Sequence, residues 1–194
     1  MKNNPTVVSF NTPGYELILE EHLAKSMDCH PDLKWLQFKI NDQGDWLYNT
    51  QKKVEVLLKA LETEEEILYV DVDAQVLCDT FEELVDAVPD GYIGGCVFLK
   101  HSDWYKNDSD KVEPLTGTLY LRRSAIPMLK EWQSKLAHGP DGDAFGIVVG
   151  NHKMFPLDIK WCYINSLPTS GYGGIECSEP EIVHYQASRG KHYA

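Results

Sequence analysis

The sequence lacks an apolar run long enough to cross a membrane, and its first residues lack the apolar stretch of a signal peptide. It also lacks CxxC spacing. The five cysteines are scattered and odd in number, so neither a disulfide framework nor a zinc site is expected. Reduced cysteines that serve packing are typical of cytoplasmic proteins. We therefore expect a cytoplasmic protein without a membrane span.

Basic residues are scarce. The chain has 18 Lys and Arg against 30 Asp and Glu, which gives a formal net charge of −12. A field of this sign repels polyanions, so nucleic acid is disfavoured as a partner. A small anionic ligand can still bind where a divalent cation or a local basic cluster receives it. The C-terminal segment "SRGKHY" holds such a cluster.

The whole chain has 194 residues and contains no internal repeat and no linker-like stretch. Strand-like and helix-like segments alternate through its first half. Apolar runs and alternation predict strands at 6–10, 33–40, 67–70, 92–99, 117–123 and 182–185. Helical spacing and end signals, including a capping box at Thr80 and Glu83, predict helices at 15–25, 51–61, 81–88, 124–139 and 141–149. This order predicts a single α/β domain over residues 1–194, with a twisted, mostly parallel sheet flanked by helices.

Two aspartates, Asp71 and Asp73, follow the apolar strand 67–70. In such sheets ligands bind beyond the carboxyl ends of the strands, where these residues are expected to lie. Side by side, the two carboxylates repel each other and resist desolvation, and a divalent cation such as Mg²⁺ or Mn²⁺ relieves both problems. The alternative is a solvated turn that happens to hold two acids.

The segment "ILYVDVDAQVLCD" resembles the DxD segment of the GT-A-fold glycosyltransferases, which use nucleotide-diphospho-sugars. The resemblance implies a Mn²⁺ (or Mg²⁺) cofactor, with Asp73 as a direct ligand and Asp71 on the nucleotide ribose or on the metal through water. It also implies a UDP-sugar as donor. Haloacid-dehalogenase-like phosphatases carry a similar strand end, with the residue at Asp71 as nucleophile. In this chain Gln75 replaces the Thr or Val that their motif usually has, and "GDAFG" lacks the second acid of their later motif.

The segment "EIVHYQASRGK" resembles the C-terminal signature of the same glycosyltransferases. This resemblance implies that His184 completes the metal site and that Lys191, with Arg189 beside it, contacts the donor phosphates. The gap between the histidine and the lysine is seven residues here, against six in the tightest version of the signature. The alternative for His184 is a core histidine with satisfied nitrogens.

The segment "VVSFNTPGY" resembles the family's first strand and loop, which hold the nucleotide base. The residues that the resemblance implies are Ser9, Asn11, Thr12 and Tyr15. The alternative is an ordinary strand-to-helix turn in which Asn11 or Thr12 caps the helix.

Two further segments resemble family elements that contact the donor. "NTQKKVEVLLKAL" resembles a lysine-bearing helix, with Lys52 as first choice for the contact and Lys53 as second. "EPLTGTLYLRR" resembles a strand that lines the donor sugar and acceptor, through Thr116 and Gly117. A lysine on a helix surface is more often simply solvated.

"GPDGDAFGIVV" resembles the helix that brings an acid to the acceptor side. Asp143 is the better match, and Asp141 is expected either to share the role or to cap the helix. The acid would be the general base of an inverting enzyme, or would orient the donor sugar in a retaining one. Trp46 and Trp104 are candidates for stacking on a sugar, or for half-buried packing.

The resemblances together predict a metal-dependent glycosyltransferase whose acceptor is a hydroxyl of a glycan or protein. A non-catalytic module that binds sugar nucleotides remains an alternative.

Overall fold

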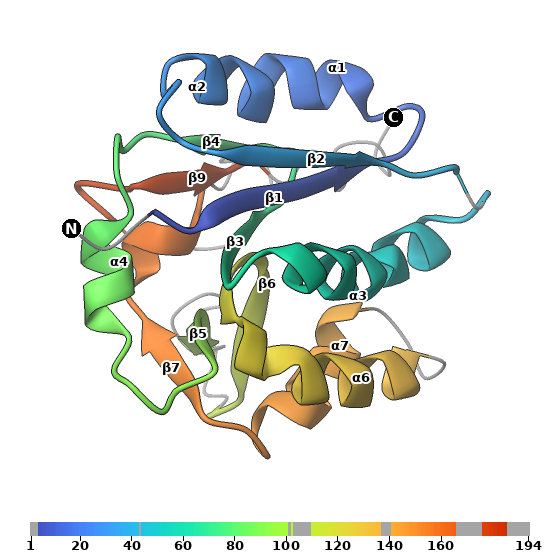
Figure 1. Ribbon diagram of the computed structural model, residues 1–194, viewed down its shortest axis with the longest axis vertical. Coiled ribbons are helices and arrows are strands. Elements are labelled where there is room, and N and C mark those ends of the chain that lie inside the picture. Colours follow the sequence, from blue (N-terminus) through green and yellow to red (C-terminus); the bar gives the residue numbers. More distant parts are fainter. Residues whose placement is uncertain are drawn as a thin grey trace.

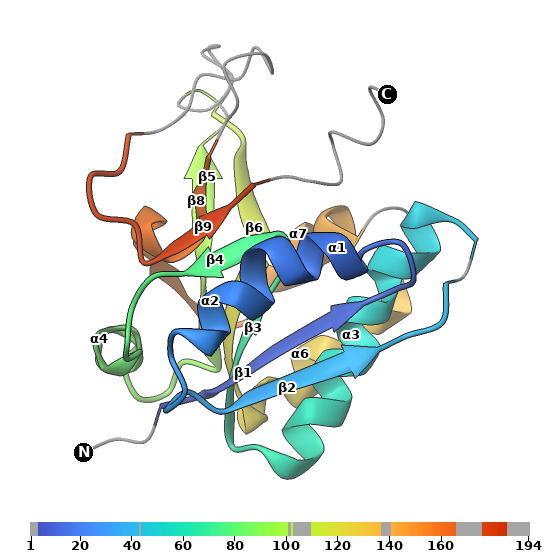
Figure 2. The same ribbon diagram turned by 90° about the horizontal axis from the view of Figure 1, so that it is seen from above.

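The computed structural model describes residues 4–42, 44–100, 102, 110–136, 141–165 and 176–185. Its main sheet has six strands in the order β2-β1-β3-β6-β5-β7 (Figures 1 and 2). The strands are β1 (Thr6–Asn11), β2 (Trp35–Lys39), β3 (Glu66–Val70), β5 (Gly94–Lys100), β6 (Val112–Arg122) and β7 (Met154–Leu157). β6 is antiparallel to both of its neighbours, and the other three pairings are parallel. The predicted α/β fold with a mostly parallel sheet is confirmed.

Helices cover both faces of this sheet. On one face lie α3 (Trp46–Thr63), α6 (Ile126–Lys135) and α7 (Asp141–Val149), and on the other lie α1 (Glu16–Leu19), α2 (Lys25–Asp28) and α4 (Glu82–Ala87) (Figure 1). Successive strand residues therefore enter different cores: Ile67 and Tyr69 belong to the first cluster and Leu68 and Val70 to the second. Burial on both faces explains why β3 is continuously apolar instead of alternating.

A second, three-stranded sheet was not expected. Its order is β4-β9-β8, with β4 (Ala74–Val76), β8 (Tyr163–Ile164) and β9 (Ile182–His184). β4 follows β3 after a short turn, and β9 runs antiparallel to it with Ala74 opposite His184. This small sheet brings together two segments that lie more than a hundred residues apart in the chain.

Several helix boundaries differ from the expected ones for local reasons. α3 begins at Trp46 instead of residue 51, because the Asp45 side chain accepts a hydrogen bond from the Leu47 amide at 2.7 Å and caps the helix. The capping box at residue 80 is only half formed. The Thr80 hydroxyl accepts from the Glu82 amide at 3.2 Å, but Glu83 pairs with Lys160 instead of reaching back.

The helix expected at 15–25 runs on to Asp28 and contains a π-helical turn, η1 (Glu20–Ala24), between α1 and α2. Short 3₁₀ turns, η2 (Arg123–Ala125) and η4 (Ile159–Cys162), precede α6 and β8. Gly139, the stop expected for the helix at 124–139, lies outside the described residues. No helix in the described part of the chain combines the length and hydropathy needed to cross a membrane.

Candidate metal centre and cleft

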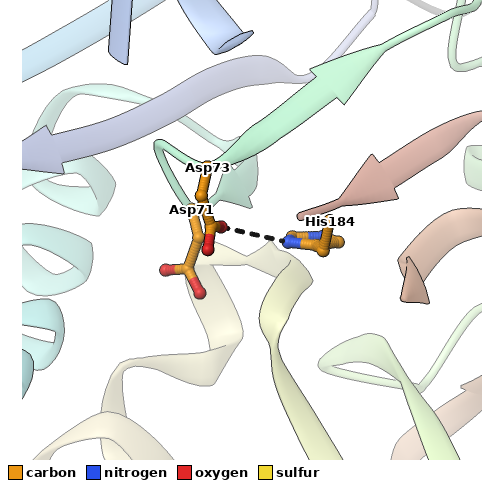
Figure 3. Close-up of side chains that lie close together, drawn as sticks. All are labelled: Asp71, Asp73 and His184. Carbon is orange, nitrogen blue, oxygen red and sulfur yellow. Dashed lines mark ion pairs between the residues drawn. The ribbon is translucent and has the colours of Figure 1, made fainter. Parts of the chain in front are cut away.

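Asp71, Asp73 and His184 form one cluster at the carboxyl end of β3 (Figure 3). Each offers a ligand atom, and these atoms all lie within 4.8 Å of one another. Asp71 and Asp73 sit in the turn between β3 and β4, while His184 ends β9. The β4–β9 pairing therefore sets the distance between the acids and the histidine.

The His184 ring is held from both sides. Its Nδ1 lies 3.7 Å from Oδ1 of Asp73, and its Nε2 lies 2.8 Å from the hydroxyl of the buried Thr118. A hydrogen bond at one ring nitrogen orients the ring and leaves the other nitrogen to bind a metal. The alternative of a core histidine with satisfied nitrogens also agrees with these two contacts, so the metal-ligand role of His184 stays a prediction.

The pKa values of the cluster reflect its crowding. Burial of the His184 ring opposes the imidazolium, but Cys162 and Asp73 outweigh it and raise the pKa of His184 to about 10. Burial and the neighbouring Asp73 raise the pKa of Asp71, although Lys53 acts in the opposite direction. Without a cation His184 therefore holds a proton that a metal would displace.

Gly117 leaves room for the cluster. A Cβ built on Gly117 would lie 2.9 Å from Cε1 and 3.1 Å from Nδ1 of His184, and 3.4 Å from Oδ2 of Asp71. Its carbonyl oxygen accepts a hydrogen bond from the Asp71 amide at 2.9 Å. A glycine is therefore needed at this position because the histidine ring occupies the space that a side chain would fill.

Lys53 is a buried cation beside the cluster. Its Nζ lies 3.3 Å from Oδ1 of Asp71 and 3.0 Å from Oδ2 of Asp141, and it donates to the Thr116 carbonyl at 3.1 Å. Burial opposes the ammonium charge, but Asp141 and Asp71 outweigh it and raise the pKa of Lys53 above its usual range. Tyr69 lies beneath Lys53, with 5.0 Å between Nζ and the ring centroid, and its hydroxyl donates to Asp71 at 2.6 Å.

These groups open onto a cleft of about 420 Å³. One wall comes from the end of β1 and the turn after it, and another from the first turns of α3. The start of β6 and the N-terminus of α7 complete it. The predicted residues in the lining are Asn11, Thr12, Tyr15, Trp46, Lys53, Asp71, Asp73, Thr116, Gly117, Asp141 and His184.

Three predicted residues lie elsewhere. Ser9 is fully buried, where its hydroxyl accepts a hydrogen bond from Nε1 of Trp35 at 2.9 Å, and it is outside the cleft lining. Lys52 points away and pairs with Glu55 at 2.8 Å, so the lysine that faces the cleft is Lys53. Asp143 is exposed and outside the lining, so Asp141 is the acid of α7 that faces the cleft.

The order within each pair follows from helix geometry. Neighbouring helix residues point about 100° apart, and in α3 Lys53 lies on the buried side whereas Lys52 lies at the surface. Asn11 keeps its place in the cleft while its side-chain oxygen accepts from Gln37 at 2.9 Å. Neither Asn11 nor Thr12 caps α1, whose N-cap residue is Tyr15. Arg189, Lys191 and Trp104 lie outside the described residues.

Sequence reasoning missed Tyr69, Thr118 and Cys162. Tyr69 stands two residues before Asp71 on the same strand, so the period of two could have pointed to it. Thr118 bonds His184 only because β6 and β9 meet in space. Cys162 is buried, lines the cleft and contacts His184, and nothing in its sequence neighbourhood signals this.

No family sequence model matches the chain, and no curated protein sequence is detectably similar to it. Solved structures do resemble it. A glycosyltransferase involved in the glycosylation of the major capsid of PBCV-1 superposes with a TM-score of 0.67 at 12% identity, over 97% of this chain and 98% of that one.

The glycosyltransferase GlyE of Streptococcus pneumoniae TIGR4 has a TM-score of 0.62 at 13% identity, over 94% of this chain and 54% of that one. The galactosyltransferase LgtC, in complex with donor and acceptor sugar analogs, has a TM-score of 0.56 at 13% identity, over 93% of this chain and 87% of that one. The chain thus spans about half of GlyE but nearly all of the capsid glycosyltransferase. These likenesses cover almost the whole chain, with the Asp71–Asp73–His184 cluster at the end of its central strand, and the chain therefore has the GT-A fold of glycosyltransferases.

Proposed function

We propose that the protein is a metal-dependent glycosyltransferase that moves a sugar from a nucleotide-diphospho-sugar to a hydroxyl group. The observation that carries this proposal is the Asp71–Asp73–His184 cluster, which opens onto a cleft in a GT-A fold. A UDP-sugar is the proposed donor on the strength of the sequence resemblance alone. The proposed acceptor is a glycan or a protein.

The donor atoms of the cluster suit a divalent cation. Ligands of one small cation at bond lengths of about 2.0–2.1 Å lie at most about 4.2 Å apart, so a 4.8 Å cluster needs only small side-chain rotations. Two carboxylates suit Mg²⁺ or Mn²⁺, and the imidazole favours Mn²⁺. When bound, the cation supplies positive charge that holds the diphosphate and stabilises the leaving nucleoside diphosphate.

The proposed roles of the protein groups follow from their positions in the cleft. Asp73 and His184 hold the cation, and Asp71 supports them from the nucleotide side. Asn11, Thr12 and Tyr15 form the wall proposed for the nucleotide. Thr116 and Gly117 lie between this wall and α7, in the part of the cleft that we assign to the donor sugar. Contacts of Arg189 and Lys191 with the phosphates remain a prediction.

Asp141 is the acid that we place beside the reacting sugar. Its Oδ2 is already bonded to Lys53 at 3.0 Å and to the Thr116 hydroxyl at 3.3 Å, which fixes the direction of the carboxylate. A carboxylate whose direction is fixed in this way is suited to orient a substrate hydroxyl. Asp143 as general base remains a prediction without a contact in the cleft.

The alternatives differ in what they require. The phosphatase hypothesis depends on a different fold, and the GT-A likeness removes its basis. A non-catalytic module would bind a nucleotide-sugar and leave it intact. A cytoplasmic location also stays a prediction, which rests on the cysteine pattern.

A panel of nucleotide-sugars with and without Mn²⁺ tests the proposal, with release of nucleoside diphosphate and direct binding as readouts. We expect at least one donor to bind and to be slowly hydrolysed only when Mn²⁺ is present. Asp73→Ala should abolish the metal-dependent binding while the protein stays folded, because the loss of the carboxylate beside the His184 ring is partly offset by the relief of its repulsion with Asp71. Binding without turnover toward water or any acceptor would favour the non-catalytic module, and no metal-dependent binding of any donor would refute the proposal.

A further inference from the structure

The N-terminal helical segment contains a π-helical turn, Glu20–Ala24, between two α-helical pieces. Such turns are rare and occur frequently at functional sites, because the extra residue re-aims the side chains around it. His22 lies in the middle of this turn. The turn therefore determines which residues the His22 ring contacts.

His22 packs on Tyr185, the residue that follows the metal-site histidine. The two rings are stacked with 4.6 Å between their centroids and 20° between their planes. Nδ1 of His22 is buried and has no hydrogen-bond partner among the described residues. A buried polar atom without a partner is costly. The stabilising contact of this ring is therefore its stack on Tyr185, and not a hydrogen bond of Nδ1.

Tyr185 in turn is bonded to the residue before β4 and to the middle residue of that strand. Its amide donates to the carbonyl oxygen of Asp73 at 3.0 Å, and its hydroxyl donates to Oε1 of Gln75 at 2.8 Å. A shift of Tyr185 would therefore move His184 relative to Asp73, since one ligand precedes Tyr185 directly and the other accepts its amide proton.

The same helix also bonds the free edge of β4. Ser26 accepts a hydrogen bond from the Val76 amide at 3.1 Å, and Nε2 of His30 lies 3.2 Å from the Val76 carbonyl oxygen. His22 in the π-helical turn, Ser26 in α2 and His30, two residues after α2, thus contact β4 or the residue that follows β9. In both ribbon views α1 and α2 lie alongside β4 (Figures 1 and 2).

We infer that His22 is a positioning residue for the metal centre: its stack on Tyr185 holds β9 against β4 and thereby sets the Asp73–His184 distance. The aromatic face matters and the ring nitrogens do not. The metal part of this inference rests on the proposed function, whereas the ordering of β9 does not.

Two readouts on His22→Ala and His22→Phe test the inference. The first is hydrogen exchange of the Tyr185 amide in the metal-free protein. We expect exchange about tenfold or more faster in His22→Ala and within about twofold of the parent in His22→Phe, which keeps a stacking ring. The second is Mn²⁺ affinity, which should fall about tenfold in His22→Ala and change little in His22→Phe, as for other groups that orient metal ligands.

Two controls separate positioning from general damage, and a further variant can take the place of His22→Ala. Glu21→Gln changes an exposed residue of the same turn and should leave both readouts unchanged. Leu61→Ala lowers stability at the end of α3 away from the cleft and should leave Mn²⁺ affinity unchanged while the protein stays folded. Should His22→Ala fail to fold, Ser26→Ala tests the same edge. It should speed exchange of the Val76 amide and weaken Mn²⁺ binding about threefold.

Each outcome decides something. Parent-like Tyr185 exchange and Mn²⁺ affinity in His22→Ala would overturn the inference, as would unchanged readouts in Ser26→Ala if that variant is the one that folds. Equal losses in His22→Phe and His22→Ala would overturn the role of the stack. If the parent protein bound no Mn²⁺ while His22→Ala still loosened Tyr185, the proposed function would fail and the positioning of β9 would stand.

Discussion

Lys53→Met should destabilise the protein far more than Lys52→Met. Lys53 is buried between Asp141 and Asp71, and methionine keeps its packing over Tyr69 while removing the charge. Removing one partner of a buried ion pair costs about 3–5 kcal/mol. The Asp141 side chain is only 9% exposed, so the loss of its partner should cost free energy in this range. We expect the lower end, about 3 kcal/mol, because the Asp71 side chain is 36% exposed and water can solvate it after Lys53 is lost.

The expected effect is large enough to measure by thermal or urea unfolding. About 3 kcal/mol corresponds to a melting temperature about 6–12 °C lower for a chain of this size. Lys52→Met removes a surface pair with Glu55 three residues along the helix and should stay within about 0.5 kcal/mol. The two variants make the same chemical change at adjacent positions, so composition and net charge are matched.

The pH dependence of the stability difference between Lys53→Met and the parent gives a second check that the lost lysine charge causes it. Because the folded-state pKa of Lys53 is raised, its contribution is fully present below the unfolded value of about 10.4 and is lost as pH rises through the folded value. On the acid side, Lys53 lowers the pKa of Asp71 in the parent, so in Lys53→Met this carboxylate becomes protonated at a higher pH than in the parent. The stability gap should therefore narrow as pH falls from 7 toward 4. Equal stabilities of Lys52→Met and Lys53→Met at pH 7 would refute the assigned burial of the cation.

Three further predictions concern the site itself. Gly117→Ala places a Cβ 2.9 Å from the His184 ring and should weaken Mn²⁺ binding about 10–100-fold in calorimetric titration, and parent-like affinity would contradict the packing argument. Because the pKa of His184 is raised to about 10, the metal must displace its proton at neutral pH, so Mn²⁺ affinity should rise by up to about tenfold per pH unit between pH 6 and 8. A flat profile would mean that His184 is not a ligand or that its pKa in the metal-free protein is not raised. In a nucleoside diphosphate release assay, Asp141→Asn should lower donor turnover at least about tenfold, while Asp143→Asn stays within about twofold of the parent. The reverse order would mean that Asp143, and not Asp141, is the acid that acts on the substrate.

The local acidity of the cleft bears on how it can bind a donor. Asp71, Asp73, Glu113 and Asp141 line it, and the basic groups in the described lining are Lys53 and His184. Lys53 already neutralises part of this charge. The remaining negative charge therefore repels a nucleoside diphosphate when no cation is bound, which agrees with the proposed metal dependence.

Local sequence patterns were sufficient to predict the parts of the fold that depend on neighbouring residues. The apolar run before Asp71 required a strand buried on both faces, and the helical spacing after Gln51 required a helix that packs on the sheet. The paired acids at the strand end required either solvent or a cation. These inferences need only period, burial and charge within about ten residues.

Only the tertiary structure decided which member of each pair of neighbours faces the cleft. Lys52 and Lys53 differ by one position on a helix, as Asp141 and Asp143 differ by two. The apolar stripe of α3, which includes Leu57 four residues after Lys53, favours Lys53 as the inward residue, but no local pattern states which other elements it meets there. Of the small sheet, only β9 was predicted as a strand. β4 and β8 have three and two residues, carry no periodic signal and gain their stability from pairing, so no local pattern showed that the three strands form a sheet. Sequence alone thus determined that a carboxylate pair ends the central strand, whereas long-range packing determined that Lys53, Gly117 and His184 surround it.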